Sequence, residues 1–234
     1  MPGHDLAPAG VLGEYADVPT NVLVLNGHGS TVLVDAGAGI LASWYPGQSV
    51  ELTAALNGRE PDLVLLTHLD FDHVGGVLAG TWPNDLRPTF SSTRVVVLDE
   101  AAHAARDADP DRPWNSGTRS ILMLERAGLL REVTDGEEIA AGLTLRSAPG
   151  HRSGHAVLRI GDGMLHLADT IHHALHVEHP DWDGRHDGDR ALALRTRIDL
   201  LEGAAENGTL CVSSHIRGAG RIERTRHALH WAPL

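Results

Sequence analysis

The stretch that decides the fold reads Thr67-His68-Leu69-Asp70-Phe71-Asp72-His73-Val74-Gly75-Gly76. It holds four side chains that can bind a metal ion, and the apolar run Leu63-Val64-Leu65-Leu66 comes directly before it. The apolar run predicts a buried strand, so the four side chains are expected on the loop that follows its carboxyl end. A loop can direct all four toward one centre, whereas a regular strand would send alternate residues to opposite faces. Imidazole and carboxylate ligands together suit zinc, iron or manganese.

The composition is that of an ordinary globular chain. Its 234 residues suit a single domain with one sizeable core, and the net charge of −12 argues against nucleic acid or an anionic membrane as a partner. Every basic residue is arginine, which excludes lysine Schiff-base chemistry, and the single cysteine, Cys211, excludes an internal disulfide. The first residues do not resemble a signal peptide, and no apolar run approaches the ~18 residues of a membrane span. We therefore expect a cytoplasmic protein, either a monomer or a homodimer.

Strand and helix patterns run along the whole chain. Residues 1–19 are expected to form a flexible lead-in, and residues 20–234 one domain. The expected strands are 21–25, 31–35, 62–67, 94–98, 132–134, 143–147, 156–160, 164–167 and 210–213. The expected helices are 49–56, 74–77, 99–108, 118–128 and 190–206, while 221–231 suits either a hairpin or a short helix. Periodicity alone thus predicts one domain of mixed α and β structure.

Further ligand-type residues follow three later apolar runs. They stand in Pro149-Gly150-His151-Arg152-Ser153-Gly154-His155, in Leu167-Ala168-Asp169-Thr170 and in Ser213-Ser214-His215. Together with the first stretch, and in the same order, these segments resemble the motifs of the metallo-β-lactamase fold hydrolases, whose signature is His-x-His-x-Asp-His. The resemblance covers residues 20–217. It departs from the signature at one point, because Asp70 replaces the second histidine.

The resemblance implies both a fold and a metal centre. The fold is a four-layer αββα sandwich, in which two mixed β-sheets pack face to face with helices outside. Two divalent ions are implied, one held by His68, Asp70 and His151 and the other by Asp72, His73 and His215, with Asp169 bridging them. The family also carries an Asp-x-Gly after its early hairpin, whose aspartate supports the metal site, and Asp35 matches it. His155 is expected to orient its loop rather than to bind metal.

The same resemblance implies a hydrolase acting on a small molecule. A metal-bridging hydroxide would attack an ester-like bond, in a lactone, thioester, carboxylic ester or phosphoric ester, and Asp72 would guide the proton. The segment after Asp169 is similar to the lactonase and organophosphate-hydrolase branch. Lactonases of the family often carry tyrosine three residues after the bridging aspartate, where this chain has His172. His172 either hydrogen-bonds a substrate oxygen as a catalytic residue or is a loop residue.

Asp70 alters the expected charge of the centre. Two divalent ions carry about +4, so three carboxylate ligands leave about +1, whereas the usual histidine would leave about +2. Zinc is the first expectation for both ions, and the oxygen-rich first site suits iron or manganese as well. Flavodiiron proteins of the same fold also carry a carboxylate at the second position. A diiron oxidoreductase is therefore the rival function, and a non-catalytic metal-binding protein is the third.

The remaining aromatic, histidine and cysteine residues are open to plainer interpretations. Some aromatic side chains either line an apolar pocket or pack in the core: Trp44, Trp82, Trp114, Trp182 and Phe71. Five further histidines are expected not to bind metal: His103, His166, His176, His179 and His186. Cys211 lies on an expected buried strand, so we expect its thiol to be inert.

Overall fold

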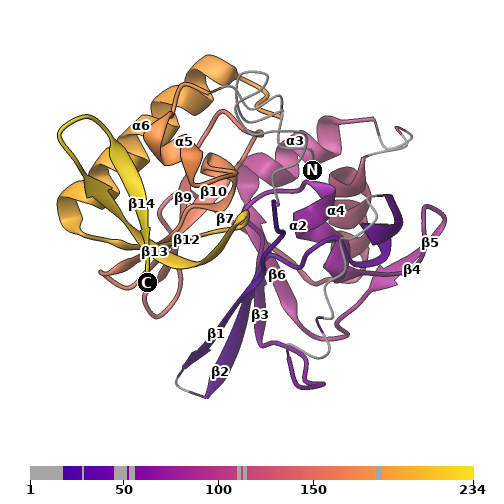
Figure 1. Ribbon diagram of the computed structural model, residues 1–234. Coiled ribbons are helices and arrows are strands. Elements are labelled where there is room, and N and C mark those ends of the chain that lie inside the picture. The colour runs from indigo at the N-terminus through magenta and orange to yellow at the C-terminus, as the bar shows by residue number, and fades with distance from the viewer. Residues whose placement is uncertain are drawn as a thin grey trace. The chain divides into compact units, whose positions relative to one another are not determined.

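The computed structural model describes residues 18–27, 29–44, 52, 56–109, 112, 115–182 and 186–234. The chain forms two compact units, Val22–Thr134 and a second unit that joins Asp135–Leu234 to the described part of Met1–Asn21. Figure 1 labels most of the helices and strands of both units. No helix within these described ranges is long and apolar enough to cross a membrane.

The unit Val22–Thr134 is built on a five-stranded sheet in the order β1-β2-β3-β6-β7. Its strands are β1 (Leu23–Gly27), β2 (Ser30–Val34), β3 (Leu63–Leu65), β6 (Arg94–Leu98) and β7 (Leu130–Val133). β1 is antiparallel to β2, and the following neighbours pair in parallel. The apolar run before the ligand stretch thus forms the central strand, and its neighbouring residues Val64 and Leu65, which point to opposite faces, are both buried. A small hairpin, β4 (Leu78–Thr81) and β5 (Asp85–Pro88), completes the unit.

Two helices, α3 (Asp99–Asp107) and α4 (Ser116–Arg126), pack on this sheet near β6 and β7 (Figure 1). Other helical elements of the unit are η2 (Gly39–Trp44), α2 (Phe71–Val74) and η3 (Gly75–Val77). α4 begins where the Asn115 side chain accepts a hydrogen bond from Thr118 N at 3.1 Å. It buries Ile121 and Leu124 in one cluster with Val95 and Val97 of β6. Burial of each such side chain stabilises the unit by roughly 1.5–3 kcal/mol.

The second unit is built on a seven-stranded sheet in the order β14-β13-β12-β11-β10-β9-β8. Its strands are β8 (Glu138–Ala140), β9 (Leu143–Ser147), β10 (Ala156–Ile160), β11 (Met164–His166), β12 (Leu210–Ser213), β13 (Ile216–Arg224) and β14 (Leu229–Pro233). β11 and β12 pair in parallel, because α6 (Arg190–Asn207) connects them after η4 (Ala168–Thr170) and α5 (Leu175–Glu178). α6 runs along β13 and β14 (Figure 1) and contributes Leu201 and Ala204 to the core of this unit.

The two mixed sheets and their helices confirm the predicted mixed α/β fold class. The expected strands 94–98, 143–147, 156–160 and 210–213 are observed without change, and 221–231 belongs to the hairpin of β13 and β14. The sequence analysis missed the β4–β5 hairpin and β8, which are short and partly exposed. The expected helix 49–56 lies outside the described residues apart from Leu52 and Leu56. Residues 1–17 of the expected lead-in also lie outside them.

The local placement of three predicted ligands needs correction. Asp72 and His73 lie on the short helix α2 and not on a loop, since the chain turns into a helix directly at Phe71. Asp169 does not end a strand: β11 ends at His166, and Asp169 lies in η4. His68 and Asp70 lie on the expected loop, and His151 and His215 follow β9 and β12 as predicted.

Arg106 on α3 provides a test of how this unit is held together. Its Nε donates to Glu125 Oε1 at 2.8 Å, and its Nη1 donates to Glu132 Oε2 at 3.2 Å. The hydrogen bonds from Arg106 lower the pKa of Glu132, although burial opposes this shift. These side chains are about a third exposed, so we expect Arg106→Ala to lower the free energy of unfolding by only ~0.5–1 kcal/mol at neutral pH.

The loss in free energy of unfolding that Arg106→Ala causes should be larger at neutral pH than at acid pH. Because the pKa of Glu132 is lowered in the folded state, its stabilisation exists above the ordinary glutamate pKa of about 4.3 and disappears as the pH falls below it. Urea denaturation of both proteins at about pH 7 and about pH 3 measures this. Arg94→Ala is the control, since Arg94 donates to the carbonyl of Gly128 and to no acid in that contact. If Arg106→Ala lowers the free energy of unfolding by the same amount at both pH values, Arg106 does not stabilise the fold through the charge of Glu132.

Candidate metal centre

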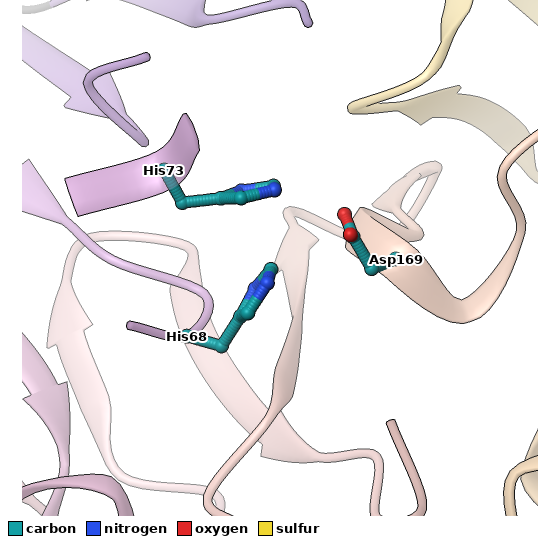
Figure 2. Close-up of side chains that lie close together, drawn as sticks. All are labelled: His68, His73 and Asp169. Carbon is teal, nitrogen blue, oxygen red and sulfur yellow. The ribbon is translucent and has the colours of Figure 1, made fainter. Parts of the chain in front are cut away.

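The first group of predicted ligands lies at the carboxyl end of β3. His68 and Asp70 stand on the loop, and Asp72 and His73 follow on α2. Figure 2 shows the His68 and His73 side chains on these two segments, and their ring centroids are 3.9 Å apart. His68 Nε2 lies 3.9 Å from Asp70 Oδ2, and His73 Nε2 lies 3.8 Å from Asp72 Oδ2. Each imidazole therefore directs its Nε2 toward a carboxylate of the same group.

Asp35 and Thr67 fix the orientation of both rings. Asp35 Oδ2 accepts a hydrogen bond from His73 Nδ1 at 2.8 Å, and Asp35 Oδ1 accepts one from Thr67 N at 2.8 Å. The Thr67 hydroxyl donates to Asp35 Oδ2 at 2.9 Å, so its oxygen accepts from His68 Nδ1 at 3.1 Å. Both histidines thus carry their hydrogen on Nδ1, and each Nε2 keeps a lone pair. Asp35 contacts a predicted ligand, as the sequence analysis expected.

Close backbone contacts hold this group in place. Ala36 N donates to His73 O at 2.7 Å, and Gly76 N donates to Gly37 O at 3.0 Å. A Cβ on Gly75 would lie 1.9 Å from Ala38 O, and one on Gly76 would lie 2.0 Å from Ala36 O. The two glycines after His73 are therefore required by packing, because any side chain would force α2 away from the loop after β2. The same loop carries Asp35 to His73.

Asp70 occupies the N-cap position of α2 without capping it. Its backbone is extended, and its side chain makes no hydrogen bond to the first turn of the helix. An aspartate at this position ordinarily accepts from a backbone N–H of that turn. Its carboxylate lies instead near His68 and is 27% exposed, the largest exposure among the four side chains. This orientation is the one that a metal ligand would need.

The second group surrounds the carboxylate of Asp169. Asp169 Oδ2 lies 3.0 Å from His215 Nε2, 3.4 Å from His172 Nε2 and 3.5 Å from His151 Nε2. His151 belongs to the loop after β9, His215 follows β12, and Asp169 and His172 follow β11. All four side chains are buried. Ser213 Oγ stabilises the turn that carries Asp169 by donating to Ala168 O and Ile171 O, both at 3.1 Å.

Two of these histidines are oriented in the same way as His68 and His73. His151 Nδ1 lies 3.0 Å from Asp187 Oδ1, and His215 Nδ1 lies 2.7 Å from Pro19 O. A carboxylate and a carbonyl can only accept, so both Nδ1 atoms carry a hydrogen. In the neutral form of each ring, Nε2 then has a lone pair, and both Nε2 atoms face Asp169. The Nε2 lone pairs of His151 and His215 thus converge on one carboxylate oxygen, and a divalent cation bound there would be attracted to both nitrogens and to the oxygen. The donor set therefore fits a metal ion.

The sequence analysis missed Asp187 and Arg197. Arg197 on α6 donates from Nη2 to Asp187 Oδ2 at 3.0 Å, while Asp187 Oδ1 accepts from His151. Burial tends to raise the pKa of Asp187, but the hydrogen bond from His151 and the charge of Arg197 outweigh it and lower this pKa to about 2. The separation of 36 residues between His151 and Asp187 leaves no spacing signal in the sequence. The four aspartates in residues 181–189 are the one feature of the sequence that could have directed attention to this segment.

His155 orients its loop, as expected. Its Nδ1 donates to Ala148 O at 2.7 Å, and its Nε2 accepts from Asp169 N at 3.2 Å. The ring thus ties the His151 loop to the backbone of Asp169, and both ring nitrogens are engaged. Neither nitrogen is directed to the carboxylate of Asp169, in contrast to those of His151 and His215.

His172 differs from the predicted ligands. Its Nδ1 is buried and has no hydrogen-bond partner among the residues that the structure describes, so no acceptor fixes its orientation as in His151. Burial lowers the pKa of His172 to about 4, although Asp169 opposes the shift. His172, Asp169 and His151 also offer three donor atoms that lie within 4.8 Å of one another. His176, which is fully buried, accepts from His172 N at 3.2 Å, and burial holds its pKa well below the usual value.

Other residues singled out in the sequence have structural roles. Trp82 and Phe71 pack against the core of their unit, and Trp182 stacks on His179 with ring centroids 4.1 Å apart. Trp114 and the side chain of Trp44 lie outside the described part of the chain. His166 Nδ1 accepts from Ala168 N at 3.2 Å. Cys211 is buried, which raises the pKa of its thiol to about 11 and agrees with the inert residue that was expected.

The network around Asp35 generates a testable prediction. An asparagine cannot accept on both of its side-chain termini, so Asp35→Asn should leave either Thr67 or His73 without an acceptor. We expect the free energy of unfolding of the metal-free protein to fall by roughly 1–3 kcal/mol. Urea denaturation followed by tryptophan fluorescence measures the change. Asp62→Asn is the matched control, because the exposed Asp62 accepts from Thr31 N and Ser30 Oγ just before β3 of the same sheet. Equal losses in the two variants would contradict the role of Asp35.

Comparison with known proteins places the chain in a family. The sequence model of the Metallo-beta-lactamase superfamily matches residues 15–206. A probable metallo-hydrolase of Mycobacterium tuberculosis is 27% identical over 191 residues, which are 65% of this chain and 57% of that relative. The chain therefore spans less than two thirds of the length of the curated relatives that it matches.

Solved structures share the fold. AidC, a dizinc quorum-quenching lactonase in complex with a product, superposes with a TM-score of 0.83 at 22% identity, over 99% of this chain and 89% of that chain. The hydrolase AbOPH of the β-lactamase superfamily superposes with a TM-score of 0.75 at 22% identity, over 92% of this chain and 79% of that chain. Since the family model covers most of the sequence, the chain belongs to the metallo-beta-lactamase superfamily.

Proposed function

We propose that this protein is a metal-dependent hydrolase that cleaves an ester-like bond in a small molecule. Seven residues would bind two divalent ions: His68, Asp70, Asp72, His73, His151, Asp169 and His215. His68, Asp70 and His151 would hold one ion, Asp72, His73 and His215 would hold the other, and Asp169 would contact both. Zinc is the first candidate, and iron or manganese is the second.

One observation carries this proposal: all four histidines of the set present Nε2 and bury a hydrogen-bonded Nδ1. The acceptors are Thr67 Oγ1, Asp35, Asp187 and Pro19 O. Histidines that bind metal through Nε2 ordinarily donate their other ring nitrogen to such an acceptor, which fixes the tautomer and the ring. Histidines buried for packing alone would have no reason to share this arrangement. Membership of the superfamily supports the same conclusion.

The residues of the chain have separate roles in the proposed reaction. When bound, two divalent ions acidify a water molecule and polarise the substrate oxygen. Asp72 is a buried carboxylate and would accept the proton that leaves the water. His172 has a ring nitrogen, Nδ1, without a partner among the described residues, so it would donate a hydrogen bond to a substrate oxygen. Burial of the histidines excludes bulk water from their Nε2 atoms.

The substrate class is proposed on narrower grounds. AidC is a lactonase, and its likeness to this chain extends to the fold. A lactone is therefore the first candidate, followed by thioesters, aryl esters and phosphotriesters. His172 replaces the tyrosine that lactonases of the family often carry, and an imidazole can supply a hydrogen bond in place of a phenol. Asp70 leaves open the rival function, a diiron oxidoreductase, because iron tolerates an oxygen-rich ligand set.

The proposed activity can be tested directly. The protein should contain two divalent ions per chain when it is purified without added metal, and it should hydrolyse at least one member of a panel of lactones, thioesters, aryl esters and phosphotriesters. Removal of metal with a chelator should abolish hydrolysis, and addition of zinc should restore it. Metal analysis and product detection are the measurements. Reductant-coupled oxygen consumption without hydrolysis of any panel member would favour the diiron function instead.

Asp70 provides the second test of the centre. Asp70→Ala should weaken binding of the first ion by ~10–100-fold or more, since it removes an anionic ligand and second-shell changes alone cost up to that amount. Asp70→His should restore the common histidine, favour zinc over manganese and move the pH–rate curve to lower pH, because a more positive centre acidifies water more strongly. Asp85→Ala is the control, as an exposed aspartate of the same unit. Wild-type affinity for both ions in Asp70→Ala would show that Asp70 is not a ligand.

A further inference from the structure

A buried ion pair lies behind His151 in the unit Asp135–Leu234. The side chains of Arg197 and Asp187 are both 3% exposed. Burial of two charges is costly unless each finds further hydrogen bonds. Arg197 meets this condition, because Nε donates to Thr170 O at 2.7 Å, Nη1 donates to Pro180 O at 2.8 Å and Nη2 donates to Asp187 Oδ2. The guanidinium therefore connects three segments, one of which directly follows Asp169.

Helix α6 provides a firm base for this pair. Ala193 on α6 packs so tightly on Gly150 that a Cβ at Gly150 would lie 2.2 Å from Ala193 N. Asp189 N donates to Gly150 O at 2.8 Å, and Gly188 N donates to His151 O at 2.9 Å. The backbone on either side of His151 is thus bound to the segment that also carries Asp187 and Arg197. The His151 ring has little freedom to turn away from Asp187.

We propose that Asp187 and Arg197 are positioning residues that set the tautomer of His151 and so its ability to bind metal through Nε2. The inference rests on the proposed metal-dependent function and goes beyond it. A neutral imidazole carries one hydrogen, and Asp187 accepts it from Nδ1 with Oδ1. Arg197 occupies Oδ2 and keeps the carboxylate charged and correctly turned. The Nε2 lone pair then faces Asp169 Oδ2 at 3.5 Å.

Asp187→Asn separates this role from simple packing. Arg197 can only donate, so the single side-chain oxygen of the asparagine should turn to Arg197 and its NH₂ group should face His151. Two donors cannot meet, so the hydrogen of His151 should move from Nδ1 to Nε2 and block the proposed metal-binding atom. Arg197→Lys keeps the charge but loses the planar fork that reaches Thr170, Pro180 and Asp187 together. It should have a similar but partial effect.

The tautomer can be read without any metal. Protein labelled with ¹⁵N-histidine, free of metal and held at about pH 9, above the ordinary histidine pKa of about 6.5, gives long-range ¹H–¹⁵N spectra that distinguish the two tautomers. The His151 signals are assigned by their loss in His151→Gln. We expect the Nδ1–H tautomer in the wild type and the Nε2–H tautomer in Asp187→Asn. Asp135→Asn is the matched control, since Asp135 pairs with Arg146 at an exposed position of the same unit.

Zinc titration against a competing chelator completes the test. Asp187→Asn should weaken the binding of one ion by ~10–100-fold, Arg197→Lys should weaken it less, and Asp135→Asn should not change it. An unchanged His151 tautomer in Asp187→Asn would overturn the inference. If the wild type binds two zinc ions and Asp187→Asn binds both with the same affinity, the inference is overturned as well. If the wild type binds no metal, the proposed function fails, whereas the spectra still decide whether Asp187 sets the tautomer. Comparable thermal unfolding of the metal-free proteins shows that each variant is folded.

Discussion

The orientation of four imidazoles by buried oxygen atoms is the interaction on which the candidate centre depends. An imidazole binds a cation only through a nitrogen that has no hydrogen, and an isolated histidine exchanges its hydrogen between two positions. Thr67, Asp35, Asp187 and Pro19 remove that freedom by accepting from Nδ1. Burying each of these acceptor oxygens is unfavourable by itself, and the hydrogen bond from the histidine offsets that cost. The Nε2 lone pairs are therefore presented before any ligand arrives.

This orientation requires close approach of backbone segments within each unit. In one unit, Gly75 and Gly76 allow α2 to rest on the loop that carries Asp35. In the other, Gly150 allows α6 to rest on the loop that carries His151. Larger residues would separate a histidine from its acceptor by a distance that no side-chain rotation could recover. The glycines that stand beside the ligand motifs thus serve the chemistry through packing.

The stretch from His68 to His73 could be singled out from the sequence because it follows a short apolar strand, whereas the full set of seven ligands was implied by the resemblance to the family motifs. β3, β9 and β12 are each followed by ligand-type residues, and the order of these residues is specific. The acceptors were harder to find, because Asp187 and Pro19 reach their histidines across 36 and 196 residues. Asp35 was found only through its resemblance to a family motif. The β4–β5 hairpin was missed because its strands are short and only partly buried, which leaves little hydrophobic pattern to detect.

Anomalous diffraction from crystals of the zinc-loaded protein tests the central claim most directly. We predict two zinc peaks about 3.5–4 Å apart, with the four histidines bound through Nε2 at about 2.0–2.1 Å and each Nδ1 still donating to its acceptor. Asp70 should bind one ion and Asp169 should bind both. Zinc held through Nδ1 of these histidines, or held by residues outside the seven, would contradict the account.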